Sequence, residues 1–80
     1  MNWRRGDNVV ATCGDQSVTA RVLVASSDGQ SLAISYSGIL AGCAEMMALL
    51  FQQDWSWKSV VTGERVELRA APVASTEPAP

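Results

Sequence analysis

The sequence predicts one small, mainly β domain, a barrel of five to six short strands. Three observations support this fold class. Apolar and polar residues alternate over short runs, Gly-containing turns separate these runs, and 80 residues leave room for a single core. Short strands joined by turns are typical of a small barrel or sandwich, and closure of a barrel removes exposed strand edges.

The first strands are predicted from their composition and punctuation. Residues 9–13 are a β-branched run that Gly14-Asp15 closes. Residues 18–25 place a valine or alanine at every second position, which is the period of a strand. The turn sequence at residues 27–29 follows, and residues 32–37 alternate in the same way.

The turn between these two strands can be chosen by asking which register gathers the apolar residues on one face. A two-residue loop would split the apolar set between both faces of the hairpin. A three-residue loop, with Gly29 in the left-handed conformation of a bulge, pairs Val24 with Leu32 and Val22 with Ile34. We therefore predict the bulged hairpin.

Residues 38–51 fit two interpretations. A helical stripe is present, but two glycines weaken a helix there, and residues 52–54 could instead join strands at 47–51 and 55–60. The stripe consists of Ile39, Cys43, Met46, Met47 and Leu50. We favour an irregular segment leading into a strand, with one helical turn near residues 42–48 left open. Thr62-Gly63 is the next turn, and Val66 and Leu68 mark a last strand with one polar face.

The composition changes once along the chain. Residues 70–80 contain all three prolines and several alanines, but only one large apolar side chain, Val73. Such a segment buries too little surface to offset the entropy of ordering it. We therefore predict a barrel domain over residues 1–69 and a disordered Pro/Ala-rich tail over residues 70–80.

The charge balance disfavours several partners. Six Lys and Arg face eight Asp and Glu, for a net charge of −2, whereas nucleic-acid binding requires neutralisation of several phosphates. Charged residues make up only 18% of the chain, which leaves neutral surface suited to self-association. No apolar region follows Arg4-Arg5, and the apolar stretch at 39–51 is too short to span a bilayer. We expect a soluble cytoplasmic protein without membrane contact.

The residues for common catalytic machinery are missing from the sequence. Without histidine, neither a Ser-His-acid triad nor a Cys-His pair is available. Most carboxylates lie beside glycine or in predicted turns, with Glu45 as the exception. Cys13 and Cys43 are expected to be reduced, packed thiols. We predict no catalytic residues, no metal and no cofactor, and therefore no enzyme.

Four aromatic residues are the candidate binding residues. Trp3, Tyr36, Trp55 and Trp57 could line a groove for a ligand or an extended peptide. The alternative is that they pack in the core or along the barrel edge. Trp55 and Trp57 would share one face of a strand.

The order of turns and core positions resembles a family of short uncharacterised bacterial, phage and mobile-element proteins, and more generally SH3-like small β-barrels. The resemblance covers most of residues 6–68 and implies a compact β domain without a known active site. Members often have proline near position 48, where this chain has Ala48. The residues that carry the resemblance are Gly6-Asp7-x-Val9, Arg21-Val22-x-Val24-x-Ser26, Asp28-Gly29-x-Ser31-Leu32, Gly38-x-Leu40-x-Gly42, Met46-Met47 and Thr62-Gly63-x-x-Val66-Glu67-Leu68.

We therefore expect a non-enzymatic binding or assembly module, an accessory protein of a mobile element, that contacts a protein partner or a second copy through aromatic and apolar surface. One alternative is a small barrel that binds single-stranded nucleic acid through Arg4, Arg5 and nearby aromatics. The other is an enzyme formed only as a symmetric oligomer with a shared pore. Plasmid-borne dihydrofolate reductases of similar length are built this way. The chain shares their Gly-Asp-x-Val opening but lacks their Val-Gln-Ile-Tyr motif.

Overall fold

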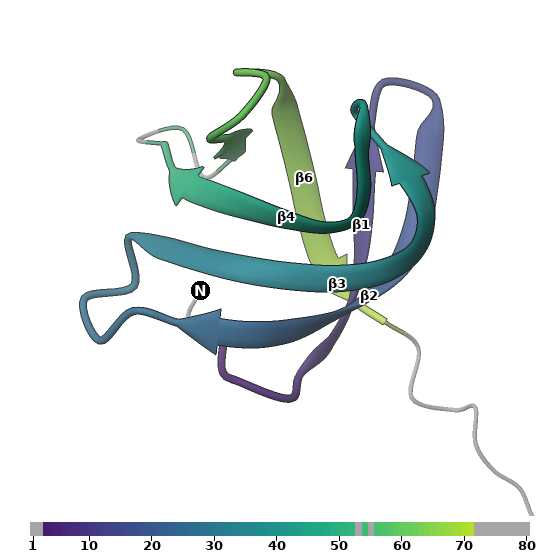
Figure 1. Ribbon diagram of the computed structural model, residues 1–80. Helices are drawn as coiled ribbons and strands as arrows, with labels where there is room; N and C mark the ends of the chain where they lie inside the picture. Colours follow the sequence, from purple (N-terminus) through teal and green to yellow (C-terminus); the bar gives the residue numbers. More distant parts are fainter. Residues whose placement is uncertain (1–2, 53, 55, 72–80) are drawn as a thin grey trace, which may run out of the picture.

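The computed structural model describes residues 3–52, 54 and 56–71. Within them the chain forms a closed antiparallel barrel in which consecutive strands are neighbours and the last strand pairs with the first. β3 and β4 cross the front of the view, with β1 and β6 behind them (Figure 1). The strands are β1 (Asn8–Cys13), β2 (Gln16–Ala25), β3 (Ser31–Leu40), β4 (Cys43–Phe51), β5 (Trp57–Ser59) and β6 (Arg65–Ala70). The predicted mainly β small barrel is confirmed, and the described residues contain only strands and their connections.

The core fills the inside of the barrel with every second side chain of its strands. β3 shows the pattern most clearly, since Leu32, Ile34 and Tyr36 are buried and the residues between them are not. Alternation of this kind follows from the two-residue period of a strand. The largest fully buried side chains are Ile34, Leu40, Met47, Leu49, Val9, Val22 and Val66.

The β2–β3 hairpin corrects part of the predicted register. Val22 pairs with Ile34, as predicted, but Val24 pairs with Ala33 instead of Leu32. The extra residue is therefore Leu23, inside the strand, and the predicted bulge in the turn is wrong. Gly29 does adopt the expected positive φ, at 73°.

Side-chain hydrogen bonds explain why this turn differs from the predicted one. The amide of Ser26 donates to the carbonyl of Ser31 at 2.9 Å, which closes a loop of four residues. The Asp28 carboxylate accepts from the Ser26 hydroxyl at 2.6 Å and from the Gln30 amide at 3.0 Å. These bonds, which depend on Asp28 and Ser26, stabilise the longer loop.

Residues 42–48 are not helical, which corrects the alternative left open for them. They form the β3–β4 turn and most of β4, with Met47 and Leu49 buried at strand spacing. Of the two nearby glycines, Gly38 lies in a bulge and Gly42 lies in a turn. Ala41 and Gly42 both have positive φ, at 50° and 79°, as the two-residue turn between Leu40 and Cys43 requires.

A second irregularity bends β3 and β4 together. Between the pairs Ser35–Met46 and Ile39–Ala44, residues 36–38 lie opposite the single residue Glu45. Glu45 has a φ of 66°, so its unusual place in an apolar stretch belongs to a bulge.

The C-terminal end of the barrel lies one residue beyond the predicted boundary. β6 ends at Ala70, and the Ala71 amide donates to the Asn8 carbonyl at 3.1 Å. Residues 72–80 of the predicted tail lie outside the described residues. In the part of the chain that the structure describes, no helix has the length and apolar character to cross a membrane.

Candidate functional site: an apolar outer face

The predicted aromatic residues do not form one surface patch among the described residues. Tyr36 is only 8% exposed, and its hydroxyl donates to the Cys43 carbonyl at 2.7 Å. Burial raises the pKa of Tyr36, and the nearby Cys43 adds to this effect. Tyr36 therefore acts as a core residue that satisfies a backbone carbonyl of β4.

The tryptophans are separated from one another. Trp57 is 4% exposed and packs edge-to-face on Phe51, with ring centroids 5.3 Å apart. Trp3 is half-buried and packs against the margin of the core. Trp55 lies outside the described residues. Of the predicted site, the structure brings Tyr36 and Trp57 into the common core.

A hollow in the described structure lies beside Phe51 and Trp57. It measures about 560 Å³ and is also lined by Asp54, Lys58 and Arg65. The pKa of Asp54 is lowered by hydrogen bonds from the Ser56 hydroxyl and amide, and less by Arg65, which lies 3.4 Å away. The carboxylate of Asp54 is therefore ionised and paired with Arg65. It is suited to a structural role and is unsuited to donating a proton.

The buried thiol of Cys13 lies in an environment that disfavours its reactive form. Cys13 Sγ donates to Glu64 Oε1 at 3.5 Å. Burial raises the pKa of Cys13, and the hydrogen bond and negative charge of Glu64 raise it further. The reactive form of cysteine is the thiolate, which this environment disfavours. Among the described residues, no group of three or more potential ligands could hold a metal ion.

The feature that sequence reasoning missed is on the outside of β2–β5. Several large side chains that point outward there are apolar, although an outer face normally carries polar residues. Val24 is 60% exposed, Met46 54% and Leu50 46%. We define the apolar face as Val24, Ala33, Met46, Ala48, Leu50 and Val60.

The strand register arranges this face in three rows across the barrel. Successive members of a row are paired in the sheet or joined by a backbone hydrogen bond. The central row is Val24, Ala33, Ala48 and Val60; the Met46 row is Arg21, Ser35 and Met46; and the Leu50 row is Ser26, Ser31, Leu50 and Lys58.

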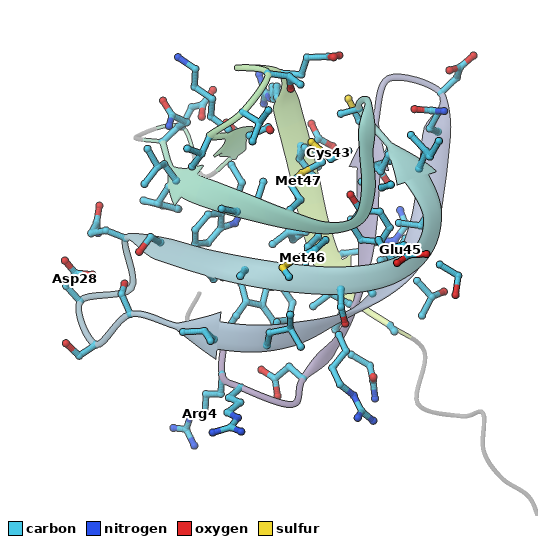
Figure 2. All side chains as sticks on the ribbon, viewed as in Figure 1. Arg4, Asp28, Cys43, Glu45, Met46 and Met47 are labelled. Carbon is cyan, nitrogen blue, oxygen red and sulfur yellow. The ribbon has the colours of Figure 1, made fainter. Side chains whose placement is uncertain are left out.

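Two local features build the face. The bulge at Leu23 shifts the phase of β2, so that Val24 points outward instead of into the core. In β4, Met46 is exposed while Met47 is 2% exposed, so adjacent methionines serve opposite faces (Figure 2). Both faces of β4 are therefore apolar.

The central row contains a shallow groove of about 260 Å³. Small side chains, Ala33 and Ala48, form its floor, while Val24, Leu50 and Val60 form its walls. Among the described residues, no charged side chain lines it, and the polar side chains in its lining are Ser26 and Ser31. The volume is below the ~300–1,000 Å³ typical of small-molecule sites, and few polar groups could orient a ligand. The groove is suited to contact with another apolar surface.

Charges of opposite sign lie at the two ends of the β2 edge of this face. Arg21 is exposed in the Met46 row. At the other end, the Asp28 carboxylate lies at the tip of the β2–β3 loop (Figure 2), where it accepts from the Ser26 hydroxyl. Hydrogen bonds from the Ser26 hydroxyl and the Gln30 amide lower the pKa of Asp28, which keeps its carboxylate charged at neutral pH.

No family model matches the chain, and comparison with curated proteins and with solved structures finds no significant match. What is established is therefore a small six-stranded antiparallel β-barrel.

Proposed function

We propose that this protein is a non-enzymatic binding or assembly module, and that it contacts a protein partner through the apolar face on β2–β5. The observation that carries the proposal is the uncharged groove of Val24, Ala33, Ala48, Leu50 and Val60. The resemblance noted in the sequence adds the context of a cytoplasmic accessory protein of a mobile element.

Folding alone does not account for this surface. Within the described part of the chain, the core already contains fourteen buried apolar residues. Outward apolar residues gain little from folding, because about half of each large side chain stays in water. Contiguous exposed apolar surface rimmed by polar residues marks sites of protein interaction. A binding surface therefore explains the composition of this face.

Affinity capture with matched variants tests the proposal. Ala48→Glu places a charge on the floor of the groove, and Ala70→Glu makes the same change at an exposed alanine on β6. The wild-type chain and Ala70→Glu should retain the same protein from a cell extract, while Ala48→Glu should lose it, since a buried unpaired charge is costly. Equal retention by all three chains would mean that the apolar face is not the contact.

A second candidate function is supported by the N-terminal segment. Trp3, Arg4 and Arg5 line a hollow of about 340 Å³ against the β2–β3 loop, which combines an aromatic ring and two cations with the carboxylate of Asp28. Bases stack on aromatics while cations hold phosphates in single-stranded nucleic-acid sites. The test is oligonucleotide binding by the wild-type chain and by Arg4→Ala/Arg5→Ala, because phosphate contacts make affinity depend on salt. Salt-independent or equal signals would exclude this function.

A further inference from the structure

The outer residues of β3 and β4 have a symmetric order about the central row. On β3 they are Ser31, Ala33 and Ser35, and on β4 they are Met46, Ala48 and Leu50. Each strand thus carries a small central residue between two flanking residues of the same kind, serines on β3 and large apolar groups on β4. A surface with such an order is complementary to itself.

This order matches a two-fold axis that runs along the central row. When two copies face each other across such an axis, each residue of the Met46 row meets a residue of the Leu50 row on the same strand of the other copy. Met46 then contacts the partner's Leu50, and Ser35 contacts the partner's Ser31. Because a two-fold interface repeats every contact, each favourable pair occurs twice.

The small residues on the axis allow close approach. Ala33 and Ala48 would each face their own equivalents, between the taller Val24 and Val60 at the ends of the row. This shape offsets the outward curvature of a barrel, which would otherwise hold two convex surfaces apart. The absence of charge in the groove also removes like-charge repulsion between identical surfaces.

The charges at the rim are complementary under the same axis. Arg21 lies one row from the axis on β2, and Ser26 lies one row away on the other side. Arg21 would therefore lie over the partner's Ser26, whose hydroxyl is 2.6 Å from the Asp28 carboxylate. A long arginine side chain reaches that carboxylate, which gives two symmetric ion pairs.

The size of the face sets the strength of the contact. Three rows about 7 Å apart on strands about 4.8 Å apart cover roughly 400 Å². A standard stable interface buries ~800 Å² per partner, so this one should be weak. Such a contact exchanges readily, as an assembly module requires.

We propose that the partner of the apolar face is a second copy of this chain, in a two-fold dimer with Arg21 paired to the partner's Asp28. The inference rests on the proposed function, since it names the occupant of the same surface. It commits to contacts that a different protein partner would not require.

Sedimentation of the full chain from ~10 μM to ~1 mM tests the dimer. The wild-type chain and Ala70→Glu should show a rising dimer fraction. Ala48→Glu should raise the dissociation constant more than about tenfold, because its two carboxylates would face each other near the axis. A wild-type chain that stays monomeric, or a dimer that Ala48→Glu leaves unchanged, overturns the proposal. If a monomeric chain still captures a protein in an Ala48-dependent manner, only the self-association is wrong; if it captures none, the proposed function fails as well.

Mixing charge-reversed variants tests the arrangement independently of the groove. Arg21→Asp and Asp28→Arg should each weaken the dimer by about tenfold, because each turns two attractions into two repulsions. An equimolar mixture should recover near wild-type association, since both rim contacts of the mixed dimer then join opposite charges. Such recovery could not occur if either variant were merely unfolded. Two weakened variants whose mixture stays weak would exclude the two-fold arrangement.

Discussion

The outer faces of β6 and β4 show what a barrel strand needs and what it does not. On β6 the outward residues Arg65, Glu67 and Arg69 are charged and exposed. The Arg65 guanidinium lies 3.7 Å from the Glu67 carboxylate. On β4 the outward residues Met46 and Leu50 are also exposed but apolar. Both strands bury their inner side chains in the same core. One apolar face is therefore sufficient to place a strand against this core, and that packing does not require the second apolar face of β4.

The largest expected effect separates two adjacent leucines of β4. Leu49 is fully buried, so Leu49→Ala should lower the free energy of unfolding by ~2–5 kcal/mol. Leu50 is 46% exposed, so Leu50→Ala should cost less than ~1 kcal/mol. Denaturant unfolding of both variants measures the difference. Similar losses would mean that Leu50 contributes to the core and that the comparison between strands is wrong.

The next effect concerns the polar group inside the barrel. Tyr36→Phe keeps the ring but removes the donor to the part-buried Cys43 carbonyl, which should cost ~1–3 kcal/mol. Ser35→Ala, at the neighbouring position on the outer face of β3, should cost less than ~0.5 kcal/mol. Thermal unfolding compares them. A neutral Tyr36→Phe would show that the hydroxyl does not support β4.

The sequence indicates the inner face of the barrel more clearly than it indicates the structure of β4. The inner face could be predicted because Leu32, Ile34 and Tyr36 repeat at strand spacing. Around β4 the sequence fits a helical stripe as well as a strand, because an apolar residue occurs at almost every position. A strand that is apolar on both faces has no alternation, so periodicity cannot distinguish it from a buried helix.

The position of Val24 could not be predicted for a different reason. Its orientation depends on the bulge at Leu23, and thus on the closure of a four-residue loop by Ser26 and Asp28. Local turn preferences favoured a shorter loop. The aromatic residues were visible in the sequence, but whether Tyr36 and Trp57 point inward depends on register, which only the assembled sheet determines.

A smaller effect is expected in the loop that borders the apolar face. Gly29 has a φ of 73°, a region that β-branched residues resist, so Gly29→Val should cost more than ~1 kcal/mol. Ser27→Val, in the same loop, serves as the control and should be milder. Denaturant unfolding is the measurement. A stable Gly29→Val chain would indicate that the loop can close without this conformation.

The smallest effect is a change of titration at the rim of the face. Ser26→Ala removes the main cause of the low pKa of Asp28, which should rise toward the ordinary value of about 3.9. Because the folded-state pKa is depressed, the associated stability is present above ~pH 4 and is lost as pH falls through the folded-state pKa. Carboxyl NMR titration follows Asp28 and Asp54 together. The pKa of Asp54, whose carboxylate accepts hydrogen bonds from Ser56, should be unaffected. A shift of both pKa values would indicate a general change of fold.

The central claim is that the outer face of β3 and β4 is a contact surface, whereas that of β6 is not. NMR of the wild-type chain, recorded from ~10 μM to ~1 mM, follows the alanine methyls of the apolar face and the backbone amide of Glu67, an outward residue of β6, in one experiment. We expect the Ala33 and Ala48 methyl signals to move with concentration while the Glu67 amide signal stays in place. Static signals from Ala33 and Ala48, or an equal movement of the Glu67 amide, would contradict this claim.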